Sequence, residues 1–519
     1  MWPMKRSPPA PEPPDGSHKA DRHLGTDHLD HDLVARSVRG GMVTLGAQGA
    51  KVAIQFVAVV LLARLLAPAD FGVFAMVAAF LGALEILKDL GLSTATVQRP
   101  QITSRQVSTL FWLNAGLGVT VALGLAACAP LLAWLYREPI LLDIVPIVAV
   151  AFAFNGFGTQ HLALLRRQMR FSLIALVQVS GEMVALVAAV TAALAGMGLW
   201  SLVIQRLAWA FFTTLMAWIA CDWRPGRPGS LSDVKGMIAF GGNATASMVV
   251  SFLASSLDKV LIGWWWGAAS LGFYERAQKL LQLPIQNLNT PLATVALPAL
   301  SRLADQPARY RDAYLAAAER LTMLIAPIGG LFIAAGDLVV TLLLGSQWTE
   351  SAVILKWMGV SAIYMPITYS LSWLYMSQDR TPEMLRAGFV NASLSVVALL
   401  AGLQFGAAGV AAAYAISGIT LRAPLLLWLA GRRGPVRTRD LVRVLLLPLC
   451  AVAAVAGVGI AVRSWSALAA LPIPAEVAVL VTAMGTAALL VYAAFPRGRQ
   501  VFRDTARQIR TIVRGEARA

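Results

Sequence analysis

Charged side chains are concentrated in one apolar stretch of the chain, DKVLIGWWWGAASLGFYERA, from Asp258 to Ala277. Within it or just beyond its end stand Asp258, Lys259, Glu275, Arg276 and Lys279. An ionised side chain at the centre of a bilayer costs roughly 2.5–3.5 kcal/mol, so five such groups facing lipid would cost on the order of 10 kcal/mol or more. We therefore expect them to line a water-filled cavity, to pair with one another, or to lie near the membrane interface.

The spacing within this cluster suggests its chemistry. Arg276 and Lys279 are three residues apart on a helix, so both can face one anionic group, whereas Glu275 and Lys279 are four apart and can pair. Arg276 and Lys279 are therefore candidates for binding one anionic group.

Glu182 and Arg206 are two further charges inside apolar runs. Glu182 is a candidate either for ion or proton coupling or for a hydrogen-bonded structural role. Arg206 either adds to a cationic cavity or pairs with Glu182. Lys51, Arg64 and Lys356 also lie in apolar runs, and the long side chains of Arg64 and Lys356 can reach the outer interface.

The sequence offers no sign of an enzyme. It contains no Walker-type phosphate loop, no HExxH and no GxSxG, and the predicted extracytoplasmic loops are too short to hold a catalytic domain. The three cysteines are isolated, so neither a disulfide framework nor a metal site is predicted. We therefore predict no catalytic residues, no metal, no cofactor and no nucleic-acid partner.

The composition identifies an integral membrane protein. The chain has 519 residues, of which 58% are hydrophobic and 13% charged, whereas soluble domains carry about 25% charged residues. Apolar runs of about 20 residues predict helices rather than barrel strands, and about fourteen spans can be drawn. Their ranges are 40–66, 71–95, 107–130, 140–162, 172–195, 198–221, 237–265, 270–297, 314–342, 351–376, 383–403, 408–430, 441–462 and 473–495. Pro284, Pro291 and Pro298 predict a kinked or partly unwound eighth span.

Lysine and arginine are concentrated in alternate loops, and this bias explains the net charge of +16. The positive-inside rule then places both termini in the cytoplasm. Residues 1–36 are polar and proline-rich and are predicted to be a disordered tail. Its histidines, interleaved with aspartates, are expected to be solvated rather than to bind metal. Residues 497–519 form a basic tail that can become an amphipathic helix on an anionic membrane surface.

A repeat of about two hundred residues divides the chain. Gly41 and Gly241, Ala69 and Ala269, Gly72 and Gly272, and Phe74 and Tyr274 are each 200 positions apart. The repeat predicts two six-helix lobes related by an axis along the membrane normal, at residues 37–222 and 237–431, with 223–236 as a cytoplasmic linker and 432–496 as an extra helix pair. Such parallel repeats build transporters with a central cavity between two rocking halves.

At these residues the chain resembles the polysaccharide-exporter branch of the multidrug/oligosaccharidyl-lipid/polysaccharide superfamily, and within it the Wzx-like flippases that include the colanic-acid exporter. The resemblance rests on LLARLLAPADFGVFAMV (Leu61 to Val77), DLGLSTATVQRP (Asp89 to Pro100), SSLDKVLIG (Ser255 to Gly263), LGFYERAQKL (Leu271 to Leu280) and Pro284. It extends from about residue 40 through the twelfth span.

The resemblance implies a V-shaped pair of six-helix lobes in the bacterial inner membrane. It also implies movement of undecaprenyl-pyrophosphate-linked oligosaccharide between leaflets, with Lys259, Arg276, Lys279 and Arg206 binding the anionic head group. In this interpretation Asp258 and Glu275 orient those cations, and Glu182 or Asp258 couples transport to an ion. Membrane lipids, a polysaccharide polymerase and other assembly proteins are the partners it suggests. The alternatives are an ion-coupled exporter of small cationic drugs from the same superfamily, a membrane glycan polymerase or ligase, and a non-transporting scaffold.

Overall fold

The computed structural model describes residues 33–87, 92–99, 102–230, 252, 256–465 and 471–513. Every regular element in these ranges is a helix, so the predicted all-α class is confirmed. The histidine-containing tail, Gly241, residues 231–236 of the predicted linker and most of the predicted seventh span lie outside the described residues.

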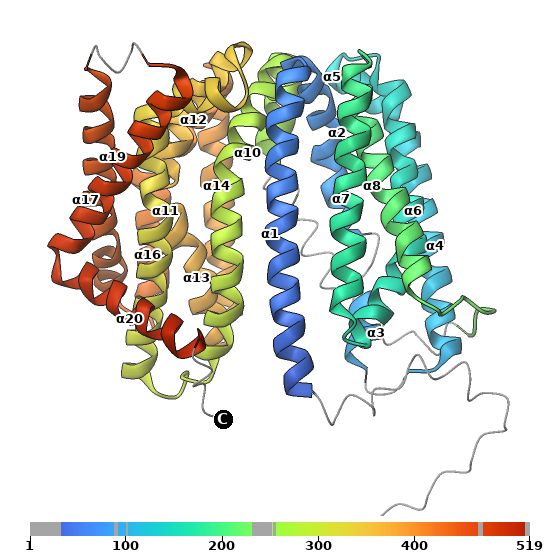
Figure 1. The fold of residues 1–519 in the computed structure, drawn as a ribbon, viewed down its shortest axis with the longest axis horizontal. Helices are drawn as coiled ribbons and strands as arrows, with labels where there is room; N and C mark the ends of the chain where they lie inside the picture. Colours follow the sequence, from blue (N-terminus) through green and yellow to red (C-terminus); the bar gives the residue numbers. More distant parts are fainter. Residues whose placement is uncertain are drawn as a thin grey trace, which may run out of the picture.

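The first half of the chain folds into eight described helices (Figure 1). They are α1 (Leu33–Leu65), α2 (Pro68–Leu87), α3 (Leu92–Gln98), α4 (Ser104–Ala127), α5 (Ala129–Tyr136), α6 (Leu141–Arg167), α7 (Phe171–Leu194) and α8 (Trp200–Ala220). Thr103 caps α4, since its hydroxyl accepts from the backbone N–H of Gln106 while the Gln106 side chain accepts from the backbone N–H of Thr103. Helix α6 packs against α4 and α8, and α7 packs against α8 and α1.

The second half contains the remaining helices. They are α10 (Leu257–Ser301), α11 (Pro307–Leu343), η4 (Ser346–Trp348), α12 (Thr349–Ser361), α13 (Met365–Ser377), α14 (Thr381–Leu403), α15 (Gly406–Ser417), η5 (Gly418–Arg422), α16 (Ala423–Gly431), α17 (Thr438–Arg463), α19 (Ile473–Ala494) and α20 (Pro496–Val513). Helix α11 is the centre of this half, packing against α12, α17 and α19.

The chain is a multi-pass membrane protein. Eleven helices in the described residues are long and apolar enough to span a membrane, or 12 if the pair Ser346–Ser361 and Met365–Ser377, bent by 46°, forms one span. The predicted number of about fourteen is therefore not reached among the described residues. The other two predicted spans fall on α10, whose charges lower its hydropathy, and on the undescribed residues before it.

Helix α10 is broken at Gly267, not at its prolines. Gly267 has φ 78° and ψ −175°, a backbone conformation that essentially only glycine adopts. The helical segments 257–266 and 268–301 therefore meet at this residue. Backbone dihedrals stay helical at Pro284, Pro291 and Pro298, so the unwinding predicted there does not occur.

The two halves lie side by side in Figure 1, with α1 in blue at their boundary. Their main contact is between α2 and α10. At the same end of the molecule, the Trp348 indole donates to the carbonyl oxygen of Ala63 at 2.8 Å, and the Gln347 amide donates to those of Ala63 at 2.6 Å and Leu66 at 3.2 Å. Phe71 packs edge-on against Trp348, with 5.4 Å between ring centroids. We call this set of contacts the closed end.

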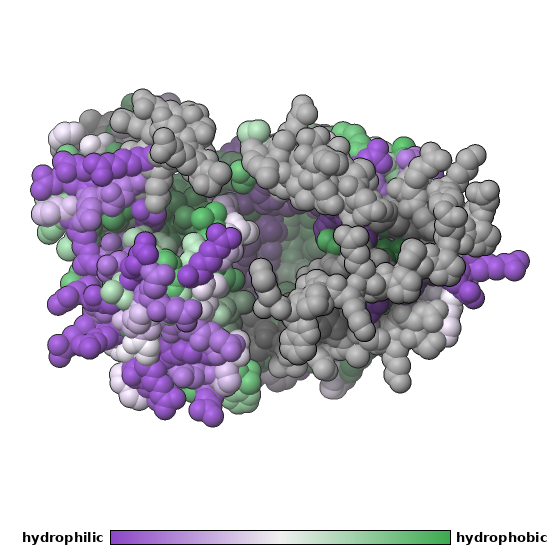
Figure 2. All heavy atoms as spheres, turned by 90° about the horizontal axis from the view of Figure 1, so that it is seen from below, coloured by the Kyte–Doolittle hydropathy of each residue, from purple (hydrophilic) through white to green (hydrophobic). Residues whose placement is uncertain are grey.

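The opposite end carries the basic loops. Seen from below, hydrophilic side chains gather over the second half, and the surface is recessed between the halves (Figure 2). The exposed arginines of this end include Arg302, Arg309, Arg432, Arg433, Arg437 and Arg439. Basic residues in alternate predicted loops thus share one face of the molecule, as the loop pattern predicts.

Candidate functional site

The charged residues of α10 form a connected cluster around the break at Gly267, which we call the α10 cluster (Asp258, Lys259, Glu275, Arg276 and Lys279). Asp258, in the first helical segment, accepts hydrogen bonds from the Tyr274 hydroxyl at 2.8 Å and the Gln278 amide at 3.3 Å, both in the second segment. It also accepts from the backbone N–H of Lys259 at 2.8 Å. Asp258 therefore holds the two segments of α10 together.

Glu275 pairs with its neighbour Arg276 rather than with Lys279. The Arg276 guanidinium donates to Glu275 Oε2 from Nε at 2.7 Å and from Nη2 at 2.5 Å. The same guanidinium lies 4.1 Å from the ring centroid of Phe71, on α2 in the other half. Both side chains of the pair are largely buried, with 12% and 19% of their surface exposed. Arg276 is thus engaged in contacts between the halves.

Lys259 and Lys279 are the cations of the cluster that are left available. Both side chains are half-buried, and their charges act on Glu275. Neither forms a hydrogen bond through its ammonium group, or an ion pair, with any residue that the structure describes. Two half-buried ammonium groups without such partners are suited to an anionic ligand, because a buried charge is stable only when it is paired.

Arg206 lies outside this cluster. It forms an ion pair with Glu85, which joins α8 to α2, and its guanidinium lies 5.4 Å from the ring centroid of Trp209. The alternative pairing with Glu182 is not formed. The sequence gives no signal for the observed pair, since its members are 121 positions apart.

Glu182 belongs to a polar ladder between α1 and α7. Lys51 donates to the Gln178 side-chain oxygen, and one helical turn further on Gln55 donates to Glu182, both at 3.3 Å. Glu182 is also near enough to Lys279 for their charges to interact. The charges of these two predicted residues therefore interact, although the residues come from different halves of the chain.

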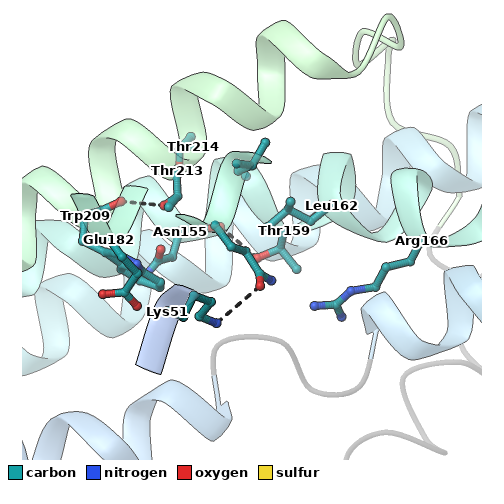
Figure 3. Close-up of a pocket in the computed structure, with 12 residues that line it drawn as sticks. Lys51, Asn155, Thr159, Leu162, Arg166, Glu182, Trp209, Thr213 and Thr214 are labelled. Atoms are coloured by element: carbon teal, nitrogen blue, oxygen red, sulfur yellow. Dashed lines mark hydrogen bonds between the residues drawn. The ribbon is translucent and has the colours of Figure 1, made fainter. Parts of the chain in front are cut away.

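A pocket of about 190 Å³ adjoins this ladder inside the first half (Figure 3). Helices α1, α6, α7 and α8 supply its walls, and its polar residues are Lys51, Asn155, Thr159, Arg166, Gln178, Glu182, Thr213 and Thr214. Sequence analysis had singled out Lys51 and Glu182 but missed the amides. The available signal was the four-residue spacing of Lys51 with Gln55 and of Gln178 with Glu182, which puts each pair on one helix face.

No group of three or more potential metal-ligating side chains occurs among the described residues. The polar groups of the cluster and the pocket are lysine and arginine nitrogens, amides and hydroxyls, with three carboxylates among them. This set of groups binds anionic and hydroxyl-rich ligands through charge-assisted and neutral hydrogen bonds.

Comparison with known proteins identifies a family. The family model described as "Polysaccharide biosynthesis protein" matches residues 61–353. The teichuronic acid biosynthesis protein TuaB of Bacillus subtilis is 25% identical, over 54% of this chain and 58% of its own length. The lipopolysaccharide biosynthesis protein WzxC of Escherichia coli is 24% identical, over 67% and 72% respectively. The succinoglycan biosynthesis transport protein ExoT of Rhizobium meliloti is 26% identical, over 59% and 62%. The chain thus spans less than two thirds of TuaB and of ExoT.

Solved structures share the fold. The lipid II flippase MurJ in an inward closed conformation superposes with a TM-score of 0.68, at 14% identity, over 88% of this chain and 99% of that one. An inward-facing MATE family transporter superposes with a TM-score of 0.61, at 12% identity, over 76% and 96%. At such identities the similarity extends to the fold alone.

Proposed function

Because this chain belongs to the family of polysaccharide biosynthesis proteins, we propose that it is a flippase for lipid-linked oligosaccharide. Its substrate would be an undecaprenyl-pyrophosphate-linked repeat unit of an exopolysaccharide, capsule or O-antigen. It would carry this unit across the bacterial inner membrane by alternating access. Residues 37–222 and 237–431 would be the two moving lobes, with 432–496 as an accessory helix pair.

The observation that carries the proposal is the pair of half-buried lysines, Lys259 and Lys279, at the boundary of the two halves. A pyrophosphate offers several anionic oxygens, and ammonium groups without protein partners are suited to receive them. In this assignment Arg276 and Arg206 support the site from their ion pairs with Glu275 and Glu85. Asp258 positions the second segment of α10, where Lys279 stands.

The conformation also fits alternating access. The closed end joins α1 and α2 to η4, whereas the surface is recessed between the halves at the basic end (Figure 2). The positive-inside rule places the basic end in the cytoplasm. We therefore infer that this conformation is inward-facing, with both termini inside the cell. The TM-score is higher with an inward-facing MATE transporter, 0.61, than with an outward-facing one, 0.52.

The proposal assigns no catalytic step to the chain. Its relatives WzxC and ExoT are named as biosynthesis and transport proteins, and chemistry on the glycan would fall to other proteins of the assembly, a polymerase among them. The competing exporter of small cationic drugs is less well supported, because the α10 cluster has three cations to two acids. A drug cation would meet Lys259 and Lys279 as like charges.

The test is deletion of the gene with complementation by the wild type and by Lys259→Gln/Lys279→Gln. Lipid-linked oligosaccharide in the membrane and polymer at the cell surface are measured together. We expect accumulation of the lipid-linked unit and loss of polymer in the deletion strain, wild-type rescue, and no rescue by the double variant. The control is Arg302→Gln/Arg386→Gln, which removes two exposed positive charges elsewhere in the second half. Unchanged polymer with altered drug susceptibility would instead support the drug exporter.

A further inference from the structure

The pocket in the first half has an excess of hydrogen-bond donors (Figure 3). Lys51 uses one of its three N–H donors on Gln178, and Arg166 forms no side-chain hydrogen bond or ion pair with the described residues. In the close-up (Figure 3), the Arg166 guanidinium points back toward the space beside Lys51. Glu182 is the single carboxylate of the lining, so the pocket has a net positive charge.

Asn155 provides an independent sign of a ligand. Its side chain is only 8% exposed, and its Nδ2 group is buried with no hydrogen-bond partner. A buried donor without a partner costs about 1–3 kcal/mol. Asn155 lines the pocket, so a ligand with an oxygen acceptor there would remove this cost.

The remaining walls suit a sugar ring. Thr159, Thr213 and Thr214 donate their hydroxyl hydrogens to backbone carbonyls of Asn155, Trp209 and Phe154, which leaves their oxygens free to accept from ligand hydroxyls. Trp209 offers an aromatic surface among these polar groups. A volume of about 190 Å³ is comparable to that of one monosaccharide unit.

We propose that this pocket binds one carboxylate-bearing sugar of the transported head group, with Lys51 and Arg166 on the carboxylate. The inference rests on the proposed function for its biological ligand but concerns a separate set of residues. Asn155 and the three threonines would hold the ring hydroxyls. Glu182 connects the pocket to the α10 cluster, because its charge interacts with that of Lys279. The pyrophosphate and the acidic sugar would then occupy neighbouring sites on the two sides of the lobe boundary.

The experiment measures, by isothermal titration calorimetry, the binding of glucuronate, glucose and inorganic phosphate to the purified full-length Lys259→Gln/Lys279→Gln variant, in which the two lysines of the α10 cluster cannot bind the phosphate. A charge-assisted hydrogen bond predicts that glucuronate binds about tenfold more tightly than glucose. Inorganic phosphate should bind more weakly than glucuronate, because it makes no ring contacts. Equal affinity for glucose and glucuronate would overturn the proposal, and so would phosphate binding as tightly as glucuronate.

Variants then locate the site. Lys51→Gln and Arg166→Gln should each weaken glucuronate binding about tenfold, whereas Lys51→Arg, which keeps the charge, should retain most of it. Arg170→Gln is the matched control, since Arg170 stands near Arg166 but does not line the pocket. Its only described ion pair is a 3.9 Å contact with exposed Asp222. Unchanged binding in both glutamine variants would refute the assignment.

This test is independent of transport. If glucuronate fails to bind while the deletion strain accumulates lipid-linked oligosaccharide, only the sugar site is wrong. If glucuronate binds as predicted while deletion leaves the polymer unchanged, the flippase proposal fails and the acidic-sugar site stands.

Discussion

Gly72 and Gly272 occupy equivalent positions on the two sides of the crossing between α2 and α10. A Cβ atom on Gly72 would collide with the carbonyl oxygen of Ala268, and one on Gly272 with that of Pro68. Gly72 therefore faces Ala268, and Gly272 faces Pro68. Residues 68 and 268, like residues 72 and 272, are 200 positions apart in the sequence. The two copies of the repeat meet here around a local pseudo-two-fold axis, with glycines allowing the backbones to touch.

Alanine at either glycine should loosen this crossing. Because the obstacle is backbone and not a flexible side chain, Gly72→Ala or Gly272→Ala should cost about 1–3 kcal/mol. The measurement is the thermal unfolding midpoint in detergent. Gly116→Ala is the control, since Gly116 lies on an exposed face of α4 and an added Cβ meets nothing within 4 Å. If all three variants unfold at the same temperature, the crossing is not a tight contact.

The 200-residue repeat could be predicted from the sequence. The two copies nevertheless differ in the side chains that form the candidate site. At the positions of Asp258, Lys259, Glu275, Arg276 and Lys279, the first copy has Ala58, Val59, Ala75, Met76 and Ala79. Backbone contacts thus follow the repeat, whereas the charges occur in the second copy alone. This contrast marks the α10 cluster as an addition to a shared framework.

Pairings within the cluster could not be predicted in the same way. Spacing on an ideal helix favours Glu275 with Lys279, but Arg276 lies over Phe71 on a helix about two hundred residues earlier, and from there its guanidinium reaches Glu275. The Arg206–Glu85 pair is likewise long-range. Sequence spacing describes one helix at a time, and these contacts depend on how separate helices pack.

Arg276 and Lys279 should respond differently to substitution. Arg276→Lys keeps the charge but loses the two-donor geometry and the stacking on Phe71, so it should lower stability by about 1–2 kcal/mol. Lys279→Gln removes a cation that has no described partner, so it should leave the unfolding midpoint nearly unchanged and reduce transport. The thermal unfolding midpoint and the transport rate are measured for both variants. A large loss of stability in Lys279→Gln would mean that Lys279 is structural.

Weakening the closed end should shift the conformational equilibrium. Gln347→Leu removes the amide that donates to Ala63 and Leu66. The loss of these hydrogen bonds should destabilise the closed end by about 1–2 kcal/mol. The fraction of molecules that are open at this end should therefore rise roughly 5–30-fold. The measurement is the distance between spin labels at positions 67 and 350, after replacement of the three cysteines. Gln404→Leu, which changes an exposed glutamine with no described side-chain hydrogen bond, serves as the control. An unaltered distance distribution in Gln347→Leu would show that these hydrogen bonds do not set the conformation.

An experiment can distinguish whether Asp258 or Glu182 couples transport to an ion. Asp258 accepts from three donors that join the segments of α10, so gain or loss of its charge would alter the position of Lys279. Glu182 accepts from one amide and lies near lysines. We predict that Asp258→Asn abolishes stimulation of transport by a pH gradient in proteoliposomes, whereas Glu182→Gln lowers the rate but keeps the stimulation. The reverse pattern would assign coupling to Glu182.

Helix α20 should bind the anionic surface of the membrane. Gly498, in its first turn, packs against the end of α19, since a Cβ there would collide with the Tyr492 carbonyl oxygen, and its Phe502 ring packs 6.1 Å from that of Tyr492. Arg499 and Arg503 are exposed, and basic residues near an anionic surface contribute about 1 kcal/mol each. Arg499→Gln/Arg503→Gln should therefore reduce the extra thermal stability of the protein in phosphatidylglycerol nanodiscs relative to phosphatidylcholine nanodiscs.

The control is Arg497→Gln, which breaks the 2.6 Å pair with Glu319. It should lower thermal stability equally in both lipids, because that contact lies within the protein. If the double variant also behaves alike in both lipids, the basic face of α20 does not contact lipid head groups.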